Sequence, residues 1–297
     1  MEFGRIVTLM INEQNNIKFN NYICFDPTSL KGFGRDFIEG PNYFGRYVSY
    51  NKLFFKGRYF PYGPCFKTVD DFKAFLRVLD KDKFAKTKFD LPLILDDKGR
   101  EQVLGLLKEF GYKEDKYIQD KETILLTKDD HKLDSNYTRY VKKAEDKYVN
   151  EIIFDPSDEQ IKEIYEIYSS SGKGRGFNIS KLEGFLELPG KVLSLMKDDK
   201  GEIQAFVLAS SVILNINVKE TKYLFLMFSA LTETGRKDSL GYIVRTKLFD
   251  HLFSNNLIDI IDFHGADRER RTYVEFKKSF GGKFYPLTGS FSKIKIF

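Results

Sequence analysis

Strand-like and helix-like segments alternate along the first half of the sequence, and this pattern most constrains the fold. Thr68 and Asp71 form a capping-box pair, and the residues after them are apolar at helical spacing. A later amphipathic stretch ends at Gly111, a typical helix stop. The predicted elements are a helix over 68–86, a strand over 89–95, a helix over 98–112 and a strand over 122–128. Such alternation favours an α/β layer structure.

The second half continues the alternation. Ser157 is placed to cap a helix whose apolar face is formed by Ile161, Ile164, Tyr165 and Tyr168. The other predicted elements are a basic helix over 136–147, an apolar strand over 222–231, a loop over 232–239, a helix over 273–280 and a closing strand over 290–297. A doubly wound nucleotide-binding fold needs a glycine-rich turn directly after its first strand, and the sequence has none there.

Length and charge set the broad class. A chain of 297 residues predicts two domains of about 150 residues each, and its net charge of +5 permits a polyanionic partner without requiring one. The two cysteines and three histidines lack metal-ligand spacing, so no metal site is predicted. The sequence shows no signal peptide and no apolar run of about 20 residues. We therefore expect a cytoplasmic monomer with reduced cysteines and no integral membrane segment.

Two basic segments are candidates for anion binding. Residues 172–177 carry Arg175 among glycines. This pattern suits a flexible loop that binds phosphate, but it equally suits a surface loop with no binding role. Residues 232–244 place Arg236 and Lys237 between a strand and a helix, where backbone N–H groups at the helix start suit a phosphate. The alternative for this second segment is an ordinary helix cap with solvated basic neighbours.

The sequence offers no nucleophile–base pair by spacing. Asp262 and His264 lie at the predicted end of a strand, where acid–base work and a capping or core role both remain open. Chemistry by positioning and charge stabilisation is therefore favoured over a covalent mechanism. In "YVEFKKSFGGKFYPL", residues 273–287, two lysines lie between two phenylalanines before a glycine pair, which is typical of a helix ending at glycine.

Six short motifs in a common order resemble the Fem family of aminoacyl-tRNA-dependent transferases, which attach amino acids to the stem peptide of peptidoglycan precursors. They are spread over most of the chain. One departs from the family pattern, with Asp120 where proline is usual, and the family's long helical arm and tryptophans are missing. The motifs are "YFPYGPCF" at 59–66, "YIQDKETILL" at 117–126, "YTRYVKKAED" at 137–146, "GRGF" at 174–177, "IDFHGAD" at 261–267 and "EFKKSFGG" at 275–282.

The resemblance implies an α/β (α+β) fold of two acetyltransferase-like (GNAT-like) domains in tandem, with mixed sheets flanked by helices and no long coiled-coil arm. The implied domains are 1–138, with a C-terminal strand at about 284–297 returning to it, and 139–283. Matched by motif, Lys277 would stabilise the developing oxyanion or the RNA terminus, Phe276 would pack beside it, and Arg175 and Lys31 would bind acceptor phosphate. Arg236 and Lys237 complete the predicted substrate-binding residues.

Three functions are consistent with these features. The first is an acyltransferase that moves an amino acid from aminoacyl-tRNA to an amine of a phosphate-bearing acceptor, such as a lipid-linked cell-wall precursor, without a cofactor. The second is a GNAT-like N-acyltransferase that uses acyl-CoA on an amino sugar, peptide or lipid amine. The third is an RNA-binding protein without catalysis. A compact pyrophosphate cradle around Arg236 and Lys237 would favour the second, and an open basic channel the first.

Overall fold

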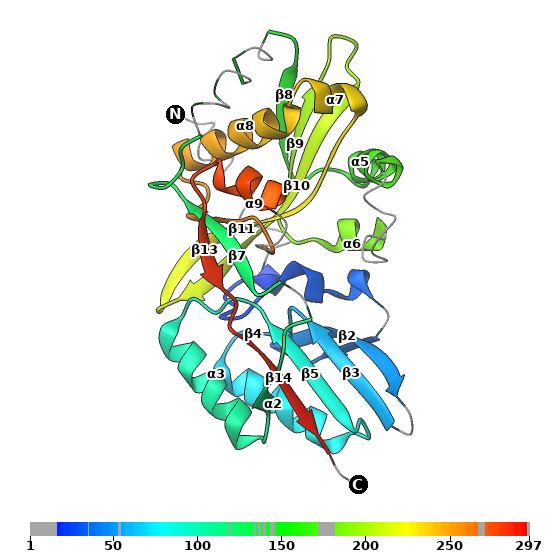
Figure 1. The fold of residues 1–297 in the computed structure, drawn as a ribbon, viewed down its shortest axis with the longest axis vertical. Helices are drawn as coiled ribbons and strands as arrows, with labels where there is room; N and C mark the ends of the chain where they lie inside the picture. Colours follow the sequence, from blue (N-terminus) through cyan, green and yellow to red (C-terminus); the bar gives the residue numbers. More distant parts are fainter. Residues whose placement is uncertain are drawn as a thin grey trace. The chain divides into compact units, whose positions relative to one another are not determined.

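The chain forms two compact units (Figure 1). The computed structural model describes residues 17–34, 36–52, 55–118, 120–133, 135, 138, 141–142, 146–171, 182–266 and 271–295. Unit 1 comprises Met1–Phe19, Ile124–Val212 and Lys222–Phe284; unit 2 comprises Asn20–Thr123, Ile213–Thr221 and Tyr285–Phe297. These units describe backbone packing, and the domain bounds 1–138 and 139–283 stay a prediction.

Unit 2 is built on a seven-stranded mixed sheet with the order β1-β2-β3-β5-β14-β6, in which β4 pairs with β2. β3 and β5 are parallel, while β14 is antiparallel to both β5 and β6. The chain's last strand therefore lies inside the sheet. The strands are β1 (Asp36–Glu39), β2 (Tyr43–Lys52), β3 (Phe55–Pro61), β4 (Cys65–Phe66), β5 (Lys86–Leu91), β6 (Lys113–Glu114) and β14 (Gly289–Ile294).

The helix α2 (Val69–Lys81) begins at the predicted Thr68 cap but ends before residue 86, and α3 (Asp97–Glu109) ends just before the predicted Gly111 stop. The Asp71 N–H donates to the Thr68 hydroxyl and the Thr68 N–H to the Asp71 carboxylate, so the predicted capping box is confirmed. Gly111 follows α3 with a φ of +77°. The apolar face of α2 enters an aromatic-rich core with the strands, made by Phe72, Phe75, Leu76, Leu79, Phe60, Phe89 and Phe291.

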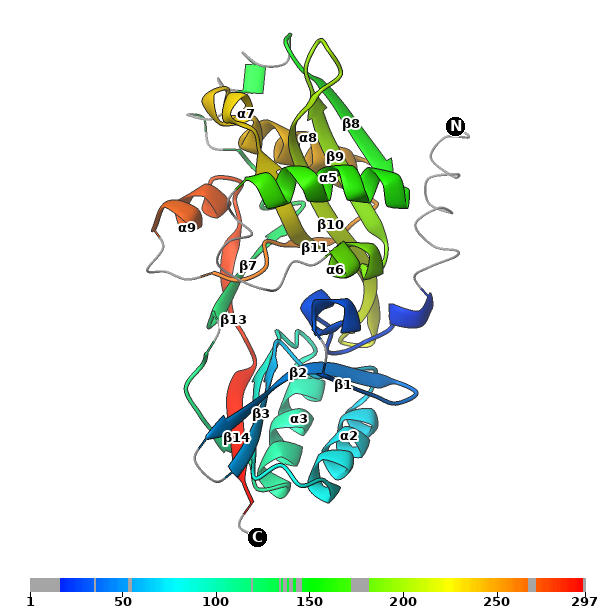
Figure 2. The same ribbon diagram turned by 90° about the vertical axis from the view of Figure 1, so that its right-hand side faces the viewer.

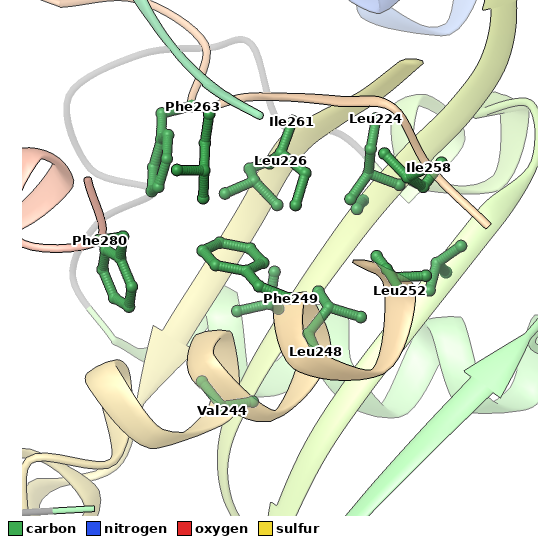
Figure 3. Close-up of a cluster of buried hydrophobic side chains, with 14 of the residues drawn as sticks. Leu224, Leu226, Val244, Leu248, Phe249, Leu252, Ile258, Ile261, Phe263 and Phe280 are labelled. Carbon is green, nitrogen blue, oxygen red and sulfur yellow. The ribbon is translucent and has the colours of Figure 1, made fainter. Parts of the chain in front are cut away.

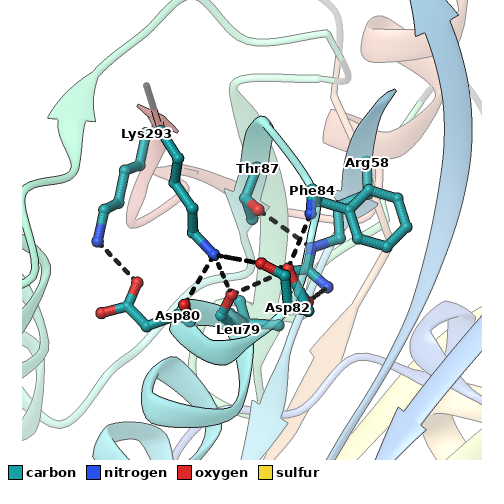
Figure 4. A network of polar contacts seen from close by, with 8 residues as sticks. Arg58, Leu79, Asp80, Asp82, Phe84, Thr87 and Lys293 are labelled. Carbon is teal, nitrogen blue, oxygen red and sulfur yellow. Dashed lines mark hydrogen bonds and ion pairs between the residues drawn. The ribbon is translucent and has the colours of Figure 1, made fainter. Parts of the chain in front are cut away.

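A buried cation joins the end of α2 to the sheet (Figure 4). Arg58 on β3 is 1% exposed, pairs with Asp82, and donates to the Thr87 hydroxyl at 3.0 Å and to the Leu79 carbonyl at 3.3 Å. Lys295, just after β14, donates to the Leu79 carbonyl at 2.6 Å. Cations at this point satisfy carbonyls that a helix end leaves unpaired and favour its dipole.

Unit 1 is built on a second mixed seven-stranded sheet, with the order β13-β7-β12-β11-β10-β9-β8. β11 and β12 are parallel, whereas β12–β7, β10–β9 and β8–β9 are antiparallel. The strands are β7 (Glu122–Thr127), β8 (Val149–Phe154), β9 (Lys191–Lys197), β10 (Ile203–Ile216), β11 (Lys219–Leu231), β12 (Ile260–Asp262) and β13 (Lys283–Pro286). The helices are α5 (Asp158–Ser170), α6 (Leu182–Glu187), α7 (Glu233–Lys237), α8 (Leu240–Ser254) and α9 (Arg271–Lys278).

Helices cover both faces of this sheet (Figure 2). α5 begins at the predicted Ser157 cap, which forms a capping box with Gln160, and it buries Ile161 and Ile164. On the other face, α8 packs its apolar side chains against the sheet and the end of α9 (Figure 3). This core contains Leu224, Leu226, Val244, Leu248, Phe249, Leu252, Ile261, Phe263 and Phe280. The predicted alternation of strands and helices is thus confirmed in both units.

Among the residues that the structure describes, no helix is long and apolar enough to cross a membrane. The predicted basic helix over 136–147 lies largely outside the described residues.

Candidate functional site

A small pocket in unit 1 is the candidate site. It measures about 40 Å³, enough for a few water-sized groups. Its lining residues come from β10, β11, α8, α9 and the segment just after β12. The lining residues are Val207, Leu226, Met227, Phe228, Ser229, Arg245, Phe263, Tyr273, Phe276 and Lys277. The predicted pair Phe276 and Lys277 thus lines one pocket, together with a second cation.

Lys277 is held by backbone carbonyl groups. Its side chain is 2% exposed, and Nζ donates to the carbonyl oxygens of Phe263 at 2.8 Å, of His264 at 3.2 Å and of Gly265. His264 and Gly265 have φ values of +53° and +76°, a left-handed turn that brings these carbonyls to one point. Nζ also lies 4.3 Å from the centre of the Tyr273 ring. The buried ammonium therefore fixes the turn that follows β12.

Arg245 is the second cation of the pocket. On α8, it donates to the Gly241 carbonyl at 2.8 Å and to the Ser229 hydroxyl on β11 at 2.8 Å. Its guanidinium lies 4.9 Å from the centre of the Phe276 ring. Burial lowers the pKa of Arg245 to about 10, so the side chain stays charged at neutral pH. Within the described part of the chain, no carboxylate pairs with it.

Asp262 orders the turn after β12 and is not among the residues that line the pocket. Its carboxylate accepts from the Tyr223 hydroxyl at 2.8 Å and from the His264 N–H at 2.7 Å. The side chain is 5% exposed. Of the two roles that the sequence left open for Asp262, these contacts correspond to the capping and core role. The same turn carries the carbonyls that hold Lys277.

The predicted loop over 232–239 is wrong, because its first part is helical. α7 is capped by Thr232, whose hydroxyl accepts from the Gly235 N–H at 3.1 Å. Arg236 and Lys237 are exposed on this short helix, and Lys237 pairs with Glu233 at 2.9 Å. Neither residue is among those that line the pocket. Their role in substrate binding stays a prediction.

Lys31 belongs to unit 2 and lies exposed in the short 3-10 helix η3 (Lys31–Phe33), which follows η2 (Pro27–Ser29). Arg46 on β2 is anchored to this segment: its Nε donates to the Thr28 carbonyl at 2.9 Å, and a Cβ added at Gly34 would lie 2.5 Å from its Cδ. Arg46 is 6% exposed, and burial lowers its pKa. In the described residues, no carboxylate forms an ion pair with it.

Sequence reasoning found one pocket cation and missed another. Arg175 lies outside the described residues, so its phosphate-binding role also stays a prediction. The family motif identified Lys277, whereas Arg245 and Arg46 belong to none of the six motifs. The only available signal was a charged residue on the apolar face of a helix or strand. Sequence alone does not distinguish such a residue from one whose side chain lies in solvent.

No family profile matches the chain, and no curated protein matches it. Solved structures do match. FemX shares 13% identity over 98% of this chain and 96% of its own, with a TM-score of 0.65. L-PGS from Bacillus licheniformis shares 14% identity over 86% of this chain and 81% of its own, with a TM-score of 0.58.

A third match is the C-terminal domain of an Agrobacterium fabrum protein assigned as a lysylphosphatidylglycerol synthetase. It shares 13% identity over 98% of this chain and 91% of its own, with a TM-score of 0.61. At these identities the likeness establishes the fold. The expectation from the sequence motifs is confirmed at that level: the chain has a Fem-like fold of two GNAT-like domains in tandem.

Proposed function

We propose that the protein is an acyltransferase that moves an amino acid from aminoacyl-tRNA to an amine of a phosphate-bearing acceptor, such as a peptidoglycan precursor. The observation that carries the proposal is the pocket in unit 1. It places two cations among aromatic rings, and no carboxylate occurs among its described lining residues. The Fem-like motifs and the fold shared with FemX support the same reading.

The pocket suits attack of an amine on an ester. In that reaction a C–N bond forms, the carbonyl oxygen gains negative charge, and the ester C–O bond then breaks. The amine's proton leaves with the ribose hydroxyl, so no covalent enzyme intermediate is needed. Fixed positive charge beside the carbonyl stabilises the oxyanion, and it acts strongly where aromatic walls exclude water. Lys277 and Arg245 are proposed to supply this charge, and Phe276 to form the wall.

The link between β11 and α8 favours aminoacyl-tRNA over acyl-CoA as the donor. A pyrophosphate cradle needs free backbone N–H groups at a helix start. Here the link is folded into α7. The Ser239 side chain does not cap α8, but Asp238 stands just before that helix, and its carboxylate accepts from the Tyr148 hydroxyl at 2.7 Å. A carboxylate at this position repels pyrophosphate.

A phosphate-bearing acceptor is proposed to meet the cations of unit 2. Lys31 is exposed, and Arg46 presents a buried guanidinium against the same short segment. The Asp26 carboxylate acts on Arg46 electrostatically without forming an ion pair, and burying a guanidinium that lacks an ion pair costs free energy, part of which a bound anion would recover. Arg175 is proposed as a further phosphate contact on the strength of its motif.

The proposal is tested by incubating the protein with a pool of charged tRNAs and candidate amine acceptors, followed by mass spectrometry of the acceptors. Acetyl-CoA serves as the parallel donor. We expect acceptor masses raised by one aminoacyl residue with tRNA and unchanged with acetyl-CoA. Acetylated products would establish the acyl-CoA enzyme instead. Tight binding of aminoacyl-tRNA without any transfer would identify an RNA-binding protein and contradict the proposal.

A further inference from the structure

Arg245 has no part in the sequence motifs, yet it lines the pocket beside Lys277. Resting on the proposed acyl transfer, we infer that Arg245 is the catalytic residue that donates a hydrogen bond directly to the acyl oxygen. Lys277 is then a positioning residue: it lines the same pocket, and its N–H donors fix the turn after β12. This divides between two residues a role that the family motif assigns to Lys277 alone.

The hydrogen bonds of Lys277 lead to this division. An ammonium group has three N–H donors and no acceptor. Three carbonyl oxygens, of Phe263, His264 and Gly265, already accept from Nζ. A direct bond to substrate would require one of these contacts to break, leaving a buried carbonyl without its donor, which is unfavourable. The charge of Lys277 still acts on the pocket, but its N–H groups are engaged.

Arg245 has donors to spare. A guanidinium carries five N–H groups. Arg245 uses one for the Gly241 carbonyl and one for the Ser229 hydroxyl, and it makes no other hydrogen bond within the described part of the chain. Three N–H groups are therefore not hydrogen-bonded within the described residues, and the side chain that carries them lines the pocket. The planar fork of a guanidinium suits an oxyanion better than a point charge does.

The guanidinium is also preorganised. It is held between β11, through Ser229, and α9, through stacking on Phe276 at 4.9 Å. A donor fixed before the reaction needs no reorganisation when negative charge develops, which is the condition for effective oxyanion stabilisation. The competing explanation is that Arg245 is only a strut joining α8, β11 and α9.

The test compares Arg245→Met with Arg245→Lys and with Arg77→Met, an exposed arginine on α2 that serves as the matched control. Single-turnover transfer is measured at saturating donor and acceptor, with and without guanidinium ion at non-denaturing concentration. Circular dichroism and thermal melting report folding. We expect Arg245→Met to lower the rate by about 100- to 1000-fold, Arg245→Lys to lower it less, and added guanidinium to restore part of the rate in Arg245→Met only.

Each alternative gives a different result. A rate for Arg245→Met within about threefold of wild type would overturn the inference, since one oxyanion donor is worth far more. Lost activity with a lowered melting temperature and no rescue by guanidinium would show that Arg245 only joins α8, β11 and α9, and would also overturn the inference. If the wild-type protein transfers from neither donor, the proposed function fails, and the inference fails with it. Normal wild-type transfer with an active Arg245→Met variant refutes the inference alone.

Discussion

Two adjacent lysines show how a single position decides the role of a side chain. Lys277 is 2% exposed and bonded to three carbonyls, whereas Lys278 is exposed and lies 3.6 Å from Glu275. They share a helix, a charge and a sequence neighbourhood. They differ because α9 turns the Lys277 side chain inward and the Lys278 side chain toward solvent. Lys278 is therefore a matched control for Lys277.

Replacing Lys277 by alanine should slow transfer by about 100- to 1000-fold, because the pocket loses a fixed charge and the turn after β12 loses its anchor. Unbonded buried carbonyls should also lower stability by about 1–3 kcal/mol. Lys278→Ala should stay within about twofold of wild type, since exposed ion pairs contribute little. Single-turnover assays and chemical denaturation measure both effects. Equal losses in the two variants would show that Lys277 has no special role.

Arg46 in unit 2 predicts an effect of inorganic phosphate on stability. If its buried guanidinium binds an anion, phosphate at about 100 times its dissociation constant should stabilise the fold by about 2.7 kcal/mol. Arg46→Met should abolish this gain, while Arg77→Met should keep it. Thermal melting in a phosphate series, at constant ionic strength with chloride, measures the effect. A melting temperature that rises equally in wild type and Arg46→Met would exclude anion binding at Arg46.

The residues of the site were only partly predictable from the sequence. Lys277 could be identified because it belongs to a motif with a fixed neighbour, Phe276. Arg245 and Arg46 could not, because the face of the element that meets the core decides whether such a side chain is buried, as Arg46 is, or partly exposed, as Arg245 is. The sequence does not show whether an arginine is exposed or buried, because that depends on how the neighbouring elements pack.

At the scale of elements, caps and apolar periodicity gave the most reliable predictions. Thr68 with Asp71 and Ser157 cap helices as predicted, because such caps involve only contacts three residues apart; Gln160 completes the capping box at Ser157. The prediction of a loop over 232–239 was wrong for the opposite reason. There Gly235 packs against the Gln204 carbonyl on β10, and the Thr232 N–H donates to that same carbonyl at 3.0 Å. Such distant contacts stabilise a short helix that local propensity does not favour.

The end of α9 predicts a position where only glycine fits. Gly281 has a φ of +95°, and a Cβ there would overlap the Asp130 carbonyl oxygen. Gly281→Ala should therefore destabilise the protein by at least about 1–2 kcal/mol. Gly105 lies inside α3, where an added Cβ would meet no atom within 4 Å, so Gly105→Ala should stabilise by up to about 1 kcal/mol. Denaturant unfolding measures both, and a stabilised Gly281→Ala variant would contradict the packing at α9.

At the scale of the whole molecule, the return of the chain's last strand could not be read from periodicity. "SFSKIKIF" alternates between polar and apolar residues like any half-buried strand, and nothing in the segment indicates which strands it pairs with. The structure places β14 between β5 and β6, with Ser290 opposite Asp90 and Ser292 opposite Lys88. Pairing across about 200 residues is set by the topology of the sheet, and the family resemblance was the sole pointer to it.

This topology makes unit 2 dependent on the last strand. Deleting residues 287–297 removes Phe291 from the core, leaves one side of β5 unpaired, and takes away Lys295, which caps the end of α2. Loss of one buried phenylalanine alone costs about 3–5 kcal/mol, a large share of the roughly 5–15 kcal/mol that stabilises a typical domain. We therefore expect unit 2 to unfold in the truncated chain.

Hydrogen exchange tests this by region. Amides of α2 and β5 should lose protection after truncation, while those of α8 in unit 1 keep theirs. A peptide of residues 287–295, added in excess, should restore protection in β5, because it can re-form the antiparallel ladder from Gly289 to Ile294. A peptide with Phe291→Ser should restore much less, since the missing ring leaves the core unfilled. Full protection of β5 in the truncated chain without any peptide would show that unit 2 does not need β14.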